Sequence, residues 1–430
     1  MIRLVFLMLI AAMPLRAATE IIEVTSEGGI TAWLVEEPSI PVLAISIEVE
    51  GGSLLDPEGL EGVTRMMMGL LEEGSGDLDT IGFAQAREDI SAGIRFRSNR
   101  QSVNISLNML SENRDETLAL ATLAMTNPSF DEAAIARVRA QMLSSAEARE
   151  QDPNQIASRV LRRAIYGDHP LRREESGTVE SINTITRDDL VAAHTAALVR
   201  DRISVGVVGD ITAEELGPLL DQLFENMPQS GPDLPGDADL DSTGETIVID
   251  FPSPQSVALF SHEGVDRGDP DFFAALVMNH ILGGGGFSSR LTDEIREKRG
   301  LTYGIGSYLA SGQRASLLTG SVNSANDTIA QALELVQTEW TKMAESGVTQ
   351  AELDAAKKYL TGSYPLQFDG NRRIAGILVG LQAEGLPIDY HLTRNAKVDA
   401  VTLEDVARAA ERFLKPDQLR FIVVGQPEGL

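Results

Sequence analysis

Residues 186–210 read TRDDLVAAHTAALVRDRISVGVVGD, and residues 402–426 read TLEDVARAAERFLKPDQLRFIVVGQ. Thr402 follows Thr186, and Gly425 follows Gly209, at the same spacing of 216 residues (402 − 186 and 425 − 209). Each copy predicts a helix, a short loop and a buried strand, and the two copies align without a gap. This internal repeat predicts two homologous domains in tandem.

Upstream segments extend the repeat. The strand pattern at 42–45 (VLAI) has a counterpart about 215 residues later at 257–260 (VALF), and each leads into a helix and a glycine turn. We therefore predict an N-terminal domain at residues 19–226 and a C-terminal domain at 245–430. Each is expected to be α+β, with a mixed or antiparallel sheet and helices packed mainly on one face.

The segment between the two predicted domains has a different composition. Residues 227–244 read MPQSGPDLPGDADLDSTG and are rich in Pro, Gly and Asp. Such a composition predicts a linker with too little apolar content to join either core.

The first 20 residues, MIRLVFLMLIAAMPLRAATE, place Arg3 before an apolar run and small residues near Ala17 and Ala18. This pattern predicts a signal peptide over residues 1–18, and no later segment approaches the roughly 20 apolar residues of a membrane span. The chain contains no cysteine, which excludes disulfides, thiolate metal sites and cysteine nucleophiles. An exported chain without disulfides is expected in a bacterial periplasm.

Charge narrows the range of partners. The chain has 36 Lys and Arg against 64 Asp and Glu, a formal net charge of −28. This surplus repels phosphate backbones and anionic lipid headgroups, so it argues against nucleic acid and favours a neutral or cationic polypeptide. The same acidity is also explained by solubility alone.

The sequence offers no local metal site and no nucleophile elbow. None of the five histidines lies three to five residues from another, and no G-x-S-x-G turn is present. His169, in the turn YGDHP, is expected to bond backbone groups. The run Gly283–Gly286 follows a predicted helix rather than a strand and lacks a following Gly-Lys-Ser/Thr, which argues against a phosphate loop.

The glycine run leads into the most informative candidate residues. Glycines permit close backbone approach, so Gly284, Gly285 and Gly286 suit either a tight helix exit or a passing peptide. A helix is predicted over 288–298 and a strand from Leu301, which places Arg296 near the helix end and Tyr303 near the strand start. One interpretation is a surface arginine paired with a neighbouring glutamate and a half-buried tyrosine. The other is a pair of hydrogen-bond donors directed at a peptide carbonyl.

A series of motifs along the chain, which together resemble those of a known family, distinguishes the two interpretations of Arg296 and Tyr303. They are GLEG at 59–62, YGDHP at 166–170, GTVESI at 177–182, SSRL at 288–291, REKRGLTY at 296–303 and the repeated ending. Together they resemble the insulinase and pitrilysin family of inverted-motif zinc peptidases, which includes mitochondrial processing peptidase. The resemblance covers nearly all of the chain after the predicted signal peptide.

The resemblance implies a zinc site that this sequence lacks. The family carries H-x-x-E-H on an early helix, and alignment on Gly62 and Gly74 puts Arg65, Met68 and Gly69 at the positions of the two histidines and the base. The family's third ligand, a later glutamate, falls near Ser145; Glu147 is close to it but insufficient alone. The implied outcome is a chain that binds no zinc and has no proteolytic activity by itself.

Heterodimeric members of the family divide the active site between subunits. The resemblance therefore implies that Arg296 and Tyr303 grip the substrate backbone and stabilise an oxyanion, while a homologous partner subunit holds the zinc in a shared acidic chamber. Two alternatives remain open at this point: a peptide-binding scaffold that has lost catalysis, and a hydrolase that uses residues of its own.

Overall fold

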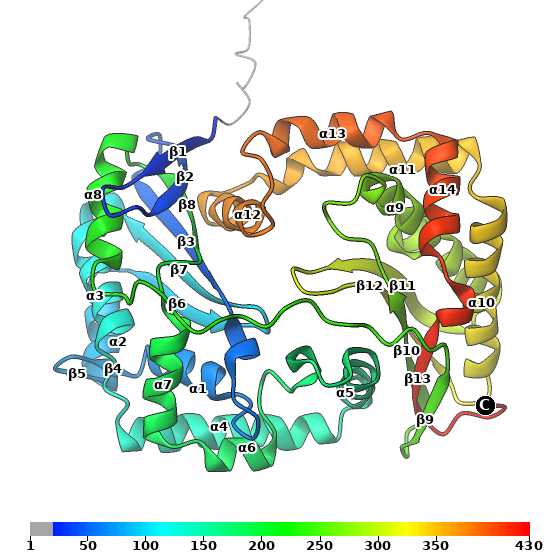
Figure 1. Ribbon diagram of the computed structural model, residues 1–430, viewed down its shortest axis with the longest axis horizontal. Helices are drawn as coiled ribbons and strands as arrows, with labels where there is room; N and C mark the ends of the chain where they lie inside the picture. The colour runs from blue at the N-terminus through cyan, green and yellow to red at the C-terminus, as the bar shows by residue number, and fades with distance from the viewer. Residues whose placement is uncertain (1–19) are drawn as a thin grey trace, which may run out of the picture.

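The computed structural model describes residues 20–430, and the predicted signal peptide at 1–18 lies outside that range. Each half of the chain builds one main sheet (Figure 1). The first half contributes β1 (Ile22–Thr25), β2 (Thr31–Glu36), β3 (Val42–Glu50), β6 (Gly93–Ser98), β7 (Ser102–Leu110) and β8 (Ile203–Gly209), with a small ribbon of β4 (Gly74–Ser75) and β5 (Leu78–Asp79). The second half contributes β9 (Thr246–Asp250), β10 (Gln255–Glu263), β11 (Thr302–Ser311), β12 (Ser316–Ala325) and β13 (Arg420–Gly425).

The two sheets share one topology. The first has the order β1-β2-β8-β3-β7-β6, and the second, read from its other end, has the order β9-β13-β10-β12-β11. In each sheet the strand from the repeated segment, β8 or β13, is parallel to one neighbour and antiparallel to the other. The predicted duplication and the α+β class with mixed sheets are therefore confirmed.

The α-helices of the described chain fall in both halves. In the first half they are α1 (Val63–Leu70), α2 (Thr80–Asp89), α3 (Arg114–Thr126), α4 (Glu132–Glu150), α5 (Pro153–Tyr166), α6 (Val179–Thr184), α7 (Arg187–Ala197) and α8 (Ala213–Phe224). In the second half they are α9 (Phe272–Asn279), α10 (Ile329–Ser346), α11 (Gln350–Ser363), α12 (Asn371–Ala383), α13 (Tyr390–Ala400) and α14 (Leu403–Phe413). None of the described helices is long and apolar enough to cross a bilayer.

The repeated motif encodes a helix start. Thr186 and Asp189 form a capping box at α7, and Thr402 and Asp405 form the same box at α14. In each box the threonine hydroxyl accepts from the backbone N–H three residues on, while the aspartate accepts from the threonine N–H. These reciprocal bonds satisfy two N–H groups that the helix cannot pair internally. The T-x-x-D signature thus fixes where both helices begin.

Each sheet is covered on one face by helices of its own half and on the other by a helix of the opposite half. Helix α12 lies on β3 and β8 of the first sheet, and α5 lies on β10 and β13 of the second (Figure 1). Ala375 and Leu378 of α12 are buried against Trp33 and Val208. Ile156, Ala157, Leu161 and Ile165 of α5 are buried against Ile422 and Val424. This exchange joins the two halves through apolar surface.

The segment after α8 crosses from one sheet to the other without regular structure (Figure 1). Its backbone is tied at Ala238, whose N–H donates to Arg314 O at 2.8 Å, and at Asp241, whose N–H donates to Ile165 O at 2.9 Å. Leu240 is partly buried in the apolar cluster under α5. The expectation that this linker joins neither core is therefore wrong, because Met227 is buried in the core of the first half and Leu240 packs against the cluster under α5.

The contact between α12 and the first sheet predicts a sensitive position. A Cβ at Gly206 of β8 would lie 2.3 Å from Ala375 O and 2.9 Å from Leu378 Cβ. Gly206→Ala should therefore displace α12 and lower the free energy of unfolding by about 1–3 kcal/mol, measured by urea denaturation.

The matched control lies on α12 itself. Gly376 is exposed, and a Cβ there would meet nothing within 4 Å. Gly376→Ala should raise stability by up to about 1 kcal/mol, because alanine favours a helix interior over glycine. Equal midpoints for Gly206→Ala and the wild type would contradict the proposed packing.

Candidate functional site

The four positions predicted to replace the zinc ligands and base meet in one place. Arg65, Met68 and Gly69 on α1 and Ser145 on α4 all line a pocket of about 280 Å³. Its other lining residues are Phe96, Arg97 and Ser98 of β6, Val138, Gln141, Met142 and Arg149 of α4, and Ser176. We call this the α1–α4 pocket. Glu147, the neighbouring carboxylate in sequence, is exposed and does not line it.

A buried carboxylate holds the start of α1. Asp56 accepts hydrogen bonds from the backbone N–H groups of Gly62 at 2.8 Å and Thr64 at 3.2 Å. Burial raises the pKa of Asp56 to about 6, although these hydrogen bonds act in the opposite direction. Gly62 has a left-handed φ of 90° and sits so close to Gly177 that a Cβ would lie 2.8 Å from Gly177 Cα. The GLEG and GTVESI motifs therefore meet in the fold and set the entry to α1.

The α1–α4 pocket has the wrong chemistry for zinc. Zinc binds imidazole, thiolate or carboxylate groups, whereas these positions offer a guanidinium, a thioether, a glycine and a hydroxyl. Met68 is also fully buried in the apolar core of its domain. Within residues 20–430, no group of three or more His, Cys, Asp and Glu side chains is arranged to hold a metal ion.

The histidines have structural surroundings. His169 follows the prediction: its Nδ1 accepts from the Leu171 N–H at 3.2 Å, and its Nε2 lies 3.0 Å from Gly236 O. His262 is buried, and its Nε2 accepts from Trp340 Nε1 at 2.9 Å. Burial lowers the pKa of His262 to about 4, so its imidazole is neutral near pH 7 and serves the core.

The second candidate region lies beside β11 and differs from the expected helix. A π-helical turn at His280–Gly284 (η4) ends the preceding helix, a 3₁₀ turn covers Gly286–Ser288 (η5), and a second π-helical turn covers Thr292–Glu297 (η6). The continuous helix predicted over 288–298 is therefore wrong at its start. Ser289 is extended there, and its hydroxyl bonds Gly286 O and Thr292 Oγ1 instead of continuing a helix.

Arg296 lies on η6 with its guanidinium stacked over an aromatic ring. The Arg296 guanidinium carbon lies 4.5 Å from the centroid of Phe287, and Arg296 Nε lies 3.5 Å from Glu297 Oε1. Glu294 is instead paired with Lys298 and Arg299. Both partners of the Arg296–Glu297 pair are partly exposed, so the pair is worth little energetically and leaves the guanidinium accessible.

Tyr303 projects into solvent. It is 88% exposed, and its hydroxyl makes no hydrogen bond among the described residues. The half-buried tyrosine of the first interpretation is therefore wrong. A register shift in the β11–β12 pairing between Thr302 and Ile305 accounts for its position, because Thr302 Oγ1 bonds Asn323 O and the Gly304 N–H locally.

The structure brings Arg296 and Tyr303 onto adjoining elements without direct contact between them in the described part of the chain. Elements η6 and β11 pack together. The turn between them is closed by the Gly300 N–H donating to Arg296 O at 2.9 Å and the Leu301 N–H donating to Ile295 O at 3.0 Å. Tyr303 is exposed and Arg296 is partly exposed, so both side chains reach the surface of the second half.

The glycine run serves mainly as a tight exit from α9. A Cβ would lie 2.4 Å from Ser307 Oγ at Gly283, 2.9 Å from Asn279 Nδ2 at Gly284 and 2.7 Å from His280 O at Gly285. Only Gly286, with a φ of +58°, has no neighbour within 4 Å. Gly284 and Gly286 are nevertheless exposed, so their backbone can meet an approaching chain.

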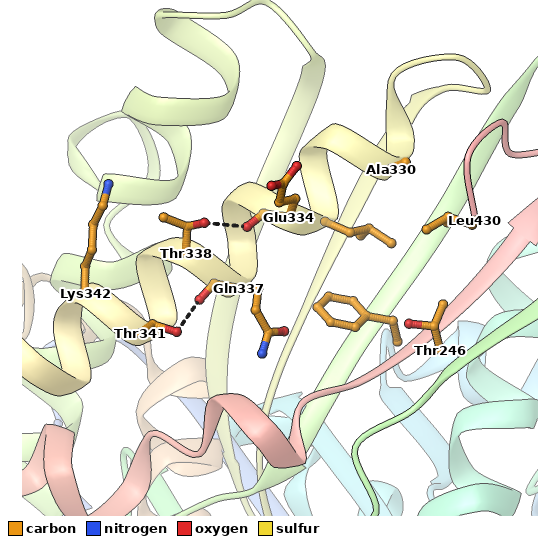
Figure 2. Close-up of a pocket in the computed structure, with 10 residues that line it drawn as sticks. Thr246, Ala330, Glu334, Gln337, Thr338, Thr341, Lys342 and Leu430 are labelled. Carbon is orange, nitrogen blue, oxygen red and sulfur yellow. Dashed lines mark hydrogen bonds between the residues drawn. The ribbon is translucent and has the colours of Figure 1, made fainter.

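A larger hollow of about 510 Å³ lies elsewhere, between α10, β9, β13 and the end of the chain (Figure 2). Figure 2 shows two of its hydroxyls already used, because Thr338 donates to Glu334 O at 2.8 Å and Thr341 donates to Gln337 O at 2.9 Å. None of the predicted site residues lines this hollow. Because it holds none of these residues, it is not the candidate site.

Comparison with known proteins agrees with a chain built from two homologous halves. Residues 32–179 match the model of the insulinase family, peptidase family M16, and residues 184–360 match the model named peptidase M16 inactive domain. The chain belongs to the M16 family of peptidases.

Relatives and solved structures cover most of the chain. It is 26% identical to the "Non-peptidase homolog YmxG" of Helicobacter pylori over 90% of both chains. It is 23% identical to the probable mitochondrial-processing peptidase subunit beta of Schizosaccharomyces pombe, over 94% of this chain and 91% of that one. The crystal structure of a peptidase M16 inactive domain from Pseudomonas fluorescens superposes with a TM-score of 0.88 at 29% identity, covering 95% of this chain and 98% of that one.

The buried carboxyl at the start of α1 predicts a pH dependence. A folded-state pKa of about 6 means that Asp56 stabilises the fold fully below pH 4 and loses this contribution as the pH rises through 6. Asp56→Asn has no such group. The stability of the wild type relative to Asp56→Asn should fall by roughly 3 kcal/mol between pH 4 and pH 7, measured by urea unfolding.

Asp405 provides a control of opposite sign. Hydrogen bonds from Thr402 and then Arg408 hold the pKa of Asp405 at about 2, so its contribution is present above pH 4 and is lost as the pH falls toward 2. A stability difference between the wild type and Asp56→Asn that stays constant from pH 4 to pH 7 would show that the pKa of Asp56 is not raised in the folded protein.

Proposed function

We propose that this chain is the non-catalytic, substrate-binding subunit of a heterodimeric periplasmic zinc peptidase. Its homologous partner holds the zinc, and this chain supplies Arg296 and Tyr303 to the shared active site. The observation that carries the proposal is a contrast within one fold. The positions of the zinc motif hold no metal ligands, while Tyr303 is exposed without a hydrogen-bond partner in the described chain.

The exposure of Tyr303 favours a binding role over a structural one. A phenol that packs against nothing contributes little to folding, since tyrosine stabilises proteins mainly through buried ring surface. Its O–H donates one hydrogen bond, and the guanidinium of Arg296 adds several more in a fixed plane. Donors of this kind stabilise the negative charge that develops on a peptide carbonyl oxygen during hydrolysis.

The surface near these residues suits a polypeptide. Phe287, Tyr303 and Tyr359 are all more than half exposed. They come from η5, β11 and α11. Of these elements, η5 packs against η6, α11 packs against η4, and β11 packs against both η4 and η6. Exposed aromatic rings bind extended chains through apolar and backbone contacts, and the net charge of −28 favours cationic segments.

The relatives support the division of labour. One is named a non-peptidase homolog and another a subunit of mitochondrial-processing peptidase, a name that describes a multi-subunit enzyme. Loss of the metal ligands removes the Lewis acid and the activated water that a zinc peptidase needs. A chain of this family without them acts on peptides through a partner.

The proposal predicts the effect of two substitutions. The chain alone should be inactive, and adding a homologous subunit with an intact H-x-x-E-H should give chelator-sensitive cleavage of an unfolded cationic peptide. Arg296→Ala and Tyr303→Phe should each lower kcat of the pair by roughly 10²-fold, because each removes a donor to the oxyanion. Assembly, measured by analytical ultracentrifugation, should be unchanged.

Tyr308→Phe is the matched control, because Tyr308 lies on the same strand and is also exposed. It removes the same hydroxyl and should leave kcat unchanged. Full activity of both Arg296→Ala and Tyr303→Phe would reject the proposed roles. A chain that forms a stable complex only with a protein that is not a peptidase would instead identify a scaffold.

A further inference from the structure

The α1–α4 pocket carries a charge that is opposite to the rest of the chain. Arg65 of α1, Arg97 of β6 and Arg149 of α4 line it, and no aspartate or glutamate does. The chain as a whole has 64 acidic residues and 36 basic ones. Three arginines without a carboxylate, drawn from three separate elements, make this pocket a local cationic site within an acidic molecule.

Two of these guanidiniums are unused by the fold. Arg65 is exposed, as is Arg97, and neither side chain has an ion pair or hydrogen bond within the described residues. Arg149 is held in place, since its Nη2 donates to Ser176 O at 3.3 Å and to Gly177 O at 2.9 Å. Burial lowers the pKa of Arg149 and the nearby Arg65 adds to this effect, while Glu174 opposes it. Two cations therefore lie within electrostatic reach of one another.

The stability of helix α1 does not explain why an arginine stands at position 65. It is the third residue of α1, in a first turn that contains no acidic residue. The N-terminal end of a helix carries partial positive charge, so an arginine there is electrostatically unfavourable. The N–H groups at the helix start are already taken by Asp56, which accepts from Gly62 and Thr64, so the attraction of the pocket for an anion rests on the arginines.

The pocket's shape suits a carboxylate on a short apolar stem. Met68, Phe96, Val138 and Met142 supply apolar wall, and Ser98, Gln141 and Ser176 supply polar edge. Its volume of about 280 Å³ accommodates one or two side chains. A planar guanidinium binds a carboxylate through two parallel N–H bonds.

We propose that the α1–α4 pocket binds a carboxylate of a polypeptide, either an aspartate or glutamate side chain or a free C-terminus. That the ligand is a polypeptide rests on the proposed function; the carboxylate preference rests on the arginines alone. Arg65 stands at a position that the family resemblance assigns to the zinc motif, and Arg97 and Arg149 line the same pocket. The pocket then holds one acidic group of a bound polypeptide. The basic residues of that polypeptide are attracted by the acidic remainder of this molecule.

Binding to the isolated full chain tests this without the partner subunit. Three fluorescent peptides of one sequence are compared by anisotropy: one with a central glutamate and an amidated end, one with glutamine and an amidated end, and one with glutamine and a free carboxyl end. The glutamate peptide, the free-carboxyl peptide or both should bind about tenfold or more tightly than the amidated glutamine peptide. The two carboxyl-bearing peptides distinguish the sources.

Substitutions test whether the pocket causes this preference for carboxyl-bearing peptides. Arg65→Met should abolish it, and Arg65→Lys should restore part of it. Arg95→Met is the matched control, because Arg95 is an exposed arginine of the same strand as Arg97 but does not line the pocket. It changes the net charge equally and should keep the preference.

Equal affinity for all three peptides would overturn the inference, as would a preference that survives Arg65→Met. Failure of the Arg296 and Tyr303 variants to lower cleavage would reject the proposed catalytic partnership but would not alter these binding results. The two proposals therefore fail separately.

Discussion

The structure depends on burial of the face of each sheet that the helices of its own half leave uncovered. Helices of its own half cover one face of the first sheet, and the other face exposes Trp33, Val35, Ala44 and Val208 to whatever lies against it. Helix α12, from the opposite half of the chain, buries these side chains, while α5 does the same for Ile422 and Val424 of the second sheet. Burial of apolar surface on this scale is the main favourable term in folding. Neither half completes its core without the other.

This exchange fixes the relation between the two candidate regions. The α1–α4 pocket belongs to the first sheet through β6, and Arg296 and Tyr303 belong to the second through β11. Because α5 and α12 each bridge the halves, the pocket and the Arg–Tyr pair are carried by one packed unit.

The two halves also differ in the segments that carry the candidate residues. In the first half, Asp56 holds the start of α1, and Gly62 meets Gly177. On that helix stand Arg65, Met68 and Gly69. The second half has an irregular segment of π-helical turns and glycines before β11, with Phe287 and Tyr303 outside the core. Unusual helix registers of this kind are frequent at functional sites.

The sequence alone was enough to predict the duplication, the α+β class, the helices after Thr186 and Thr402 and the family, because each is written in local pattern or ordered motifs. It also predicts which positions replace the zinc ligands, and the structure brings these four positions together in one pocket. It did not reveal that Arg97 and Arg149 join Arg65, since β6 and α4 approach α1 only when the core packs. It missed the anchoring of Leu240, the exchange of α5 and α12, and the exposure of Tyr303. Tertiary structure decided these features because they depend on which surfaces remain apolar after each half has folded, and periodicity along the chain does not say which distant segment covers them.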